Sequence, residues 1–186
     1  MKKPLKILLY GPTGSGKDTH SEVISATFGI PAFSAGGLMR EEIQKKTAIG
    51  LEIAQYVARG EIAPGNVATE LLKARIQEEA KKKGYVLNGY PRTVESVGTY
   101  LSYDRPTHVI HLLLSDNGVR ERLKVRGRQD DASEAVETRI RRYHEVEKPA
   151  CDLWKDQPGV HYGEISTDAP IEEVSRRVVE FIRSHA

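Results

Sequence analysis

A glycine-rich loop, Gly11-Pro12-Thr13-Gly14-Ser15-Gly16-Lys17, constrains the fold of this 186-residue chain more than any other feature of its sequence. The loop follows the apolar run 7–10 and precedes a helical pattern that begins at Lys17. Glycines let backbone N–H groups turn inward around phosphate oxygens, and the N-terminus of the helix adds partial positive charge. A strand, this loop and a helix in that order predict a phosphate-binding Walker A loop, with Lys17 near the transferred phosphoryl group.

Along the rest of the chain, short apolar runs alternate with amphipathic segments. This alternation predicts an α/β fold, a parallel sheet with helices on both faces, in which ligands bind beyond the carboxyl ends of the strands. Strands are expected over residues 7–10, 31–33, 85–88, 109–114 and 160–165. Helices are expected over residues 17–28, 35–46, 51–58, 64–82, 116–124, 132–150 and 170–184, with Gly50 as a linker and with Ser115 and Asp168 as N-caps.

Charge and cysteine content exclude several classes of protein. The chain has 28 Lys and Arg against 26 Asp and Glu, a net charge of +2, which is not typical of a general nucleic-acid binder. Its one cysteine, Cys151, permits neither an intramolecular disulfide nor a cysteine zinc site. No run approaches the roughly 20 apolar residues of a membrane helix, and the N-terminus lacks a signal-peptide pattern. We therefore expect one cytoplasmic domain, a monomer, with no nucleic-acid or membrane partner.

Four further motifs carry a resemblance that covers essentially the full chain. They are FSAGGLMR at 33–40, GEIAP at 60–64, GYVLNGYPRT at 84–93, and RGRQDD at 126–131 followed by Arg139 and Tyr143. With these motifs the chain resembles the adenylate kinase family of nucleoside monophosphate (NMP) kinases. The resemblance implies a P-loop fold of three α/β/α layers with a five-stranded parallel sheet. The core would be 1–33, 64–124 and 133–186, with an NMP-binding insertion at 34–63 and a short lid at 125–132.

The resemblance also implies the substrates, ATP and an NMP with AMP as first choice, and a role for each matching residue. The catalytic set is Lys17, Arg40, Arg92, Arg128 and Arg139. The loop residues Gly11 to Lys17, with Asp18, Thr19 and Arg126, would bind ATP. The acceptor nucleotide would be bound by Ala35, Arg40, Glu61, Ile62, Ala63, Gly89, Tyr90, Arg92 and Ser96. Asp130 and Asp131 would hold the lid in place, which we favour over a metal pair.

The basic residues fit this chemistry on physical grounds. Phosphoryl transfer between two nucleotides concentrates negative charge and needs positioning and electrostatic stabilisation rather than covalent work by the protein. Arginines at 141 and 142 are interpreted instead as part of a solvated helix face. His108 and His111 flank an apolar strand and are interpreted as structural.

Mg²⁺ is the cofactor that the resemblance implies, and two substitutions bear on how it is held. Asp18 replaces a glycine of the family's loop and is expected to be solvated or to face Mg²⁺, while the loop's hydroxyl comes from Thr19. Asn88 stands where the family has an aspartate that supports Mg²⁺ through water. Thr19 and Asn88 are therefore the expected metal-side residues, acting indirectly.

Other departures leave alternatives open. Alanine at position 35 is similar to what uridylate–cytidylate kinases have at this point of the motif. Ser96 replaces a glutamine with which adenylate kinases recognise the adenine. The lid is very short, because only Gly127 separates Arg126 from Arg128. The leading hypothesis is an adenylate kinase (ATP + AMP to two ADP). The alternatives are a UMP/CMP or broad-specificity NMP kinase, and a nucleotide-binding regulator whose catalysis has decayed.

Overall fold

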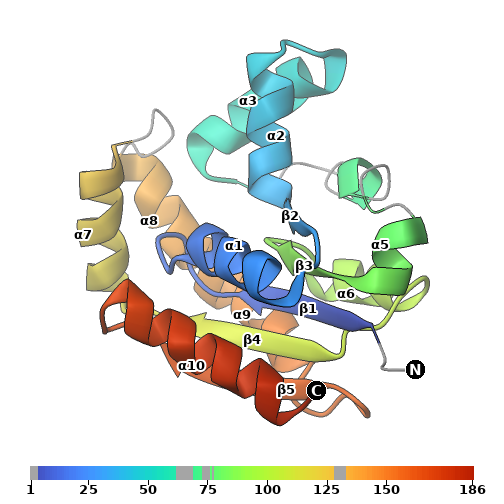
Figure 1. Cartoon of the computed structure of the whole chain (residues 1–186). Coiled ribbons are helices and arrows are strands. Elements are labelled where there is room, and N and C mark those ends of the chain that lie inside the picture. The colour runs from blue at the N-terminus through green and yellow to red at the C-terminus, as the bar shows by residue number, and fades with distance from the viewer. Residues whose placement is uncertain (1–3, 62–68, 73–75, 77, 128–132) are drawn as a thin grey trace.

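The computed structural model of the chain describes residues 4–61, 69–72, 76, 78–127 and 133–186. Its centre is a sheet of five parallel strands in the order β2-β3-β1-β4-β5 (Figure 1). The strands are β1 (Leu5–Tyr10), β2 (Ala32–Ser34), β3 (Gly84–Asn88), β4 (His108–Leu113) and β5 (His161–Ser166). All five predicted strands are present, and the predicted parallel α/β fold is confirmed.

Alternate residues of the strands divide the apolar core into two layers. Ile7 and Leu9 of β1 pack on one face of the sheet with α1 (Lys17–Phe28) and α10 (Ile171–Ser184). Leu8 and Tyr10 pack on the other face with α6 (Val94–Leu101) and α9 (Lys148–Asp152). Because successive side chains of a strand point to opposite faces, a strand that is apolar throughout is buried on both sides. The result is three layers, α/β/α.

The other helices lie toward the carboxyl ends of the strands or over the sheet margin. In Figure 1, α2 (Ala35–Gln44) and α3 (Ala48–Arg59) stand at the top of the view, and α7 (Asp116–Arg126) and α8 (Ser133–Arg142) at its left. A separate apolar cluster, with Leu123 and Ile140 at its centre, joins α7 to α8. The short α5 (Glu78–Lys83) leads into β3.

Several helix predictions need correction. The helix predicted over 64–82 is interrupted, because Ile76 lies in a bend between helical residues 69–72 and α5. Gly50 is not a linker but lies in the first turn of α3, where the Thr47 hydroxyl accepts from its N–H at 3.0 Å. A Cβ at Gly50 would lie 2.1 Å from the carbonyl oxygen of Glu42, so the glycine permits the close approach of α2 and α3. This contact could not be foreseen from local pattern.

Two more differences concern caps. Ser115 caps α7 as predicted, accepting from the Gly118 N–H. Asp168 does not cap α10; its side chain instead accepts a hydrogen bond from the Ser166 hydroxyl, and Pro170 is the N-cap residue. The helix α6 was not predicted. A capping box between Thr93 and Ser96 starts it.

The predicted helix over 132–150 is helical but not uniform. Between α8 and α9 lies a π-helical turn, η1 (Tyr143–Glu147). Pro149 follows directly in the first turn of α9. Proline removes an N–H and crowds the carbonyl four residues earlier, so a regular α-helix could not run through this segment without adjustment.

Within the described ranges, the structure has no helix with both the length and the apolar character needed to cross a bilayer.

Candidate active site

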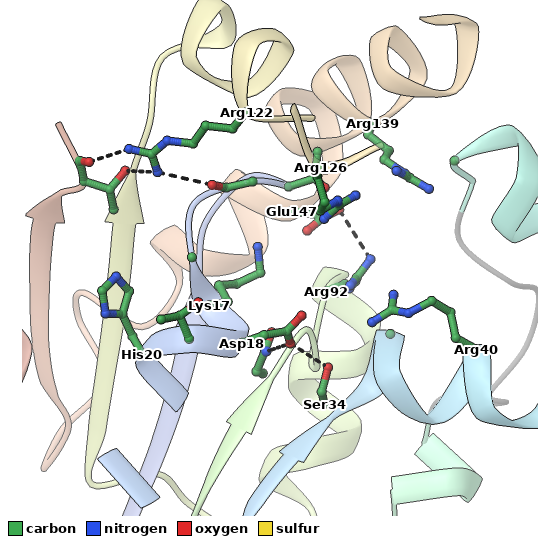
Figure 2. Close-up of a pocket in the computed structure, with 18 of the residues that line it drawn as sticks. Lys17, Asp18, His20, Ser34, Arg40, Arg92, Arg122, Arg126, Arg139 and Glu147 are labelled. Atoms are coloured by element: carbon green, nitrogen blue, oxygen red, sulfur yellow. Dashed lines mark hydrogen bonds and ion pairs between the residues drawn. The ribbon is translucent and has the colours of Figure 1, made fainter. Parts of the chain in front are cut away.

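A cavity of about 690 Å³ opens at the carboxyl ends of the strands. Its walls come from the loop after β1, from Ser34 at the end of β2, from Asn88 at the end of β3 and from Thr167 after β5. The helices α2, α3, α7, α8 and η1 close its sides. Lys17, Arg40, Arg92 and Arg139, predicted from four separate motifs, all line this one cavity (Figure 2).

Glycine conformation shapes the phosphate loop. Gly14 and Gly16 have φ values of 81° and 83°, which L side chains rarely adopt. Gly16 is the N-cap of α1, and no side chain caps this helix, so its first backbone N–H groups remain available to an anion. At Gly11, a Cβ would lie 2.5 Å from the carbonyl oxygen of Leu112, so the loop is packed directly against β4.

Lys17 is folded back over this loop. Its ammonium group donates to the carbonyl oxygens of Gly11 and Pro12, both at 2.7 Å. Burial lowers the pKa of Lys17 to about 8, although the nearby carboxylate of Glu147 acts in the opposite direction. The lysine is therefore charged at neutral pH and close to losing its proton at mildly alkaline pH.

Asp18, Thr19 and Asn88 form the oxygen-rich side of the cavity. The carboxylate of Asp18 accepts from the Asn88 amide at 2.6 Å and from the Ser34 hydroxyl at 3.1 Å, so it is anchored to the ends of β3 and β2. Asp18 and Thr19 are exposed within the cavity. A carboxylate and a hydroxyl next to a phosphate loop are ligands that suit Mg²⁺ and its bound water, so the residues present fit the metal. Asn88 contributes by orienting Asp18.

The two predicted acceptor arginines both line the cavity but come from different elements. Arg40 lies back along α2 over Gly36, where a Cβ would approach its guanidinium to 3.2 Å. Arg92 follows β3, and its Nε donates to the carbonyl of Gly89 at 2.6 Å. A Cβ at Gly89 would lie 2.8 Å from the Arg92 guanidinium. Glycine at 36 and at 89 therefore makes room for the arginine that each turn presents.

Arg126 and Arg139 face the cavity from the lid side. Arg126 is the last residue of α7, and Arg139 is buried in α8, where its guanidinium makes a long 3.5 Å contact with the carbonyl of Val57 in α3. The remaining predicted residues of this region, Arg128, Asp130 and Asp131, lie outside the described residues, as do Ile62 and Ala63 on the acceptor side.

Four predicted acceptor residues do not line the cavity. Ala35 is buried in the core with Leu72 and Leu87, and Tyr90 is buried with its hydroxyl accepting from Thr69. Gly89 acts through its carbonyl, as described above. The hydroxyl of Ser96 donates to the Thr93 carbonyl and accepts from the N–H groups of Arg92 and Thr93. Ser96 therefore shapes the turn that presents Arg92. Glu61 lies at the cavity wall, paired with Arg59 at 2.8 Å.

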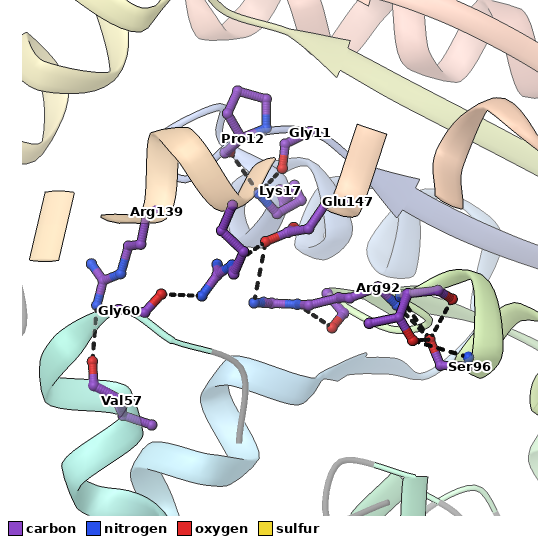
Figure 3. A network of polar contacts seen from close by, with 12 residues as sticks. Gly11, Pro12, Lys17, Val57, Gly60, Arg92, Ser96, Arg139 and Glu147 are labelled. Carbon is purple, nitrogen blue, oxygen red and sulfur yellow. Dashed lines mark hydrogen bonds and ion pairs between the residues drawn. The ribbon is translucent and has the colours of Figure 1, made fainter. Parts of the chain in front are cut away.

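Sequence reasoning missed a buried carboxylate and its partner. Glu147, in η1, is buried among cations, with its Oε1 2.7 Å from Arg142 and 3.8 Å from Arg92 (Figure 3). Arg142 was interpreted as solvated, which is wrong: it lines the cavity, and its side chain is only 14% exposed. Burial would raise the pKa of Glu147, but Arg92, Arg142 and Lys17 lower it overall, so the carboxylate is charged. Arg141, in contrast, is exposed as predicted.

A second missed feature is the far end of the cavity, beyond the phosphate loop. Arg122 of α7 is fixed there by the carbonyls of Thr167, at 2.6 Å, and Gly14, at 3.2 Å (Figure 2). Two large apolar side chains, Val125 and Ile171, line this end and are 89% and 59% exposed. Exposed apolar side chains beside a fixed guanidinium form a surface suited to the flat face of a base or ring. Only the fold brings these residues together.

Similarity to known proteins agrees with this geometry. The family pattern described as "Adenylate kinase" matches residues 9–158. The adenylate kinase of Rhodococcus erythropolis is 34% identical over 94% of this chain and 97% of its own length. That of Corynebacterium glutamicum strain R is 32% identical over 95% of this chain and 98% of its own. That of Bifidobacterium longum is 30% identical over 96% of this chain and 100% of its own.

Proposed function

The chain belongs to the adenylate kinase family and is a phosphotransferase, and on this premise we propose that it transfers the terminal phosphoryl group of ATP to AMP. The observation that carries the proposal is the convergence of Lys17, Arg40, Arg92, Arg126 and Arg139 on one cavity beside the phosphate loop. Two nucleotides with their phosphates face to face bring several negative charges into a small volume. A cavity lined by fixed cations is the environment that such a transfer needs.

Lys17 and the loop are the proposed grip on the donor. When the phosphates of ATP enter, the Lys17 ammonium exchanges the carbonyls of Gly11 and Pro12 for phosphate oxygens. The backbone N–H groups at the start of α1 bind the same phosphates. Arg126 approaches from the lid side. The donor base is proposed to rest at the apolar end of the cavity, against Arg122, Val125 and Ile171.

Arg40 and Arg92 are the proposed grip on the acceptor phosphate. They hold it in line with the transferred group, so that positioning supplies much of the rate enhancement. Arg139, and Arg128 beyond the described residues, would stabilise charge on the group in transit. A guanidinium suits this work because it stays charged and offers several donors in a fixed plane.

Mg²⁺ is the proposed cofactor. When bound with ATP it would neutralise part of the phosphate charge. Thr19 and Asp18 would hold it or its water shell, while Asn88 and Ser34 keep the Asp18 carboxylate in place.

Residues 34–63 are proposed to close over the acceptor and residues 125–132 over the donor, which excludes water during transfer. We further propose that the enzyme is a monomer, because described residues of one chain line the cavity, and that it is cytoplasmic, as its sequence predicts. Sedimentation analysis tests the oligomeric state.

A substrate panel tests the proposed function. Purified protein with Mg²⁺ and ATP is given AMP, CMP, UMP, GMP or their deoxy forms, and nucleoside diphosphate formation is followed. AMP is expected to be the preferred acceptor. Preference for UMP or CMP would favour the pyrimidine alternative, which Ala35 and Ser96 suggested from sequence. Binding of ATP without turnover of any monophosphate would favour a regulator instead.

A further inference from the structure

The carboxylate of Glu147 is an unexpected group in a cavity proposed for phosphates. It is buried, and it lies within 4 Å of two guanidinium groups that face the same space. A negative charge there repels the phosphates that the cavity would bind. We therefore expect this carboxylate to have a role that outweighs its repulsion of phosphate.

The π-helical turn puts this carboxylate in place. In an α-helix, residues five apart point about 140° away from each other, so Arg142 and Glu147 would not meet. The wider π turn over Tyr143–Glu147 brings position 147 back toward position 142, and their side chains pair at 2.7 Å. Such turns are rare, and they are common at functional sites.

The contacts of Glu147 extend to both parts of the acceptor site. Arg92, which it faces at 3.8 Å, is held on its other side by the carbonyl of Gly89. Arg142 also donates to the carbonyl of Gly60, at the end of α3 (Figure 3). One carboxylate thus links the turn after β3 to the end of the acceptor segment.

We propose that Glu147 is a positioning residue for phosphoryl transfer, whose buried carboxylate holds Arg92 and Arg142 together in the cavity and so ties the acceptor segment to the catalytic Arg92. Without this carboxylate, the neighbouring cations Arg92, Arg142 and Lys17 repel one another and move apart. The inference rests on the proposed function, since it concerns how the same site is preorganised. The carboxylate weakens ground-state attraction for phosphate and improves the geometry of transfer.

Glu147→Gln tests the proposal, because glutamine keeps the shape of the side chain and removes its charge. We expect kcat to fall roughly 10–100-fold, the loss usual when a group that orients a functional side chain is removed. The KM for AMP should change by less than about threefold, because removal of a repulsive charge offsets poorer orientation. Binding of inorganic tripolyphosphate, followed by calorimetry, should be unchanged or tighter.

Two variants separate positioning from folding. Glu145→Gln changes an exposed carboxylate of the same π turn and should behave as wild type. Glu147→Asp keeps the charge on a shorter side chain and should recover part of the kcat that Glu147→Gln loses.

If Glu147→Gln unfolds, the double variant R142Q/E147Q removes both charges of the pair and avoids an unpaired buried cation. It should retain the fold and show a fall in kcat of the same order, because Arg92 still loses its partner carboxylate. Wild-type kcat in a folded Glu147→Gln variant, or a rise in the KM for AMP without a fall in kcat, would overturn the proposal. If wild-type protein transfers no phosphoryl group at all, the proposed function fails instead.

Discussion

The proposed donor and acceptor sides of the cavity are built in different ways. The donor loop takes its shape from backbone geometry, with positive φ at Gly14 and Gly16 and close packing of Gly11 on β4. The acceptor side depends on side chains that converge from distant elements, and its segment is held through the carbonyls of Val57 and Gly60. The donor side is therefore expected to be preformed and the acceptor side to move.

The largest expected effect follows from removing the donor cation. Lys17→Met keeps much of the side-chain length but removes the charge, and kcat should fall at least about 10²–10³-fold, as when one preorganised donor is lost. Lys155→Met, an exposed lysine outside the cavity, is the matched control. A coupled assay measures both. Turnover of Lys17→Met within tenfold of wild type would contradict a donor role for this lysine.

On the acceptor side, Arg92→Lys keeps the charge and loses the planar fork. We expect kcat/KM for AMP to fall about 10²-fold, while the KM for ATP changes little, because the donor loop does not depend on this side chain. Steady-state kinetics with each nucleotide varied in turn separates the two. Arg176→Lys, on the exposed face of α10, should have no effect. An equal loss for both nucleotides would mean that the two sides are not independent.

The pH profile should also distinguish the two sides. The pKa of Lys17 is lowered to about 8, so its charge is present below that pH and is lost as pH rises through it. We expect kcat/KM for ATP to fall up to about tenfold per pH unit above pH 8. Arginines remain charged throughout this range, so AMP binding to the ATP-loaded enzyme should vary little. A flat ATP profile up to pH 9.5 would show that Lys17 keeps its proton.

The smallest effect concerns stability of the acceptor segment. Gly50→Ala places a Cβ against the Glu42 carbonyl and should destabilise the packing of α2 on α3 by about 1–3 kcal/mol. Gly98→Ala in α6 meets no atom within 4 Å and should instead stabilise by about 0.5–1 kcal/mol. Thermal unfolding measures both. Equal stability of the two variants would contradict the close α2–α3 contact.

The same contrast explains what the sequence could reveal. The phosphate loop and α1 were predicted with their observed bounds, because glycine conformation and helical periodicity are local properties. The short α6 was missed because it contains glycine and β-branched residues, which are weak helix formers, and has serine rather than Glu or Gln in its capping box. The capping box at its start and the burial of its apolar side chains stabilise α6, whereas its intrinsic helix propensity is weak.

The missed parts of the site share a different cause. Arg122 meets Thr167 and Gly14 only in the folded chain, across separations of 45 and 108 residues. Arg142 looked solvated because an α-helical pattern places it away from Glu147. Pro149 was the available signal, since a proline inside a long predicted helix indicates a local change of geometry just before it.

Transfer of a labelled phosphoryl group tests the central claim most directly. Wild-type protein is incubated with Mg²⁺, AMP and ATP labelled in its terminal phosphate, and the nucleotides are separated. The cavity is expected to pass the label to AMP, so that labelled ADP forms in step with loss of ATP and little inorganic phosphate appears. Label found only in inorganic phosphate, or only in ATP, would contradict transfer between two nucleotides held in this cavity.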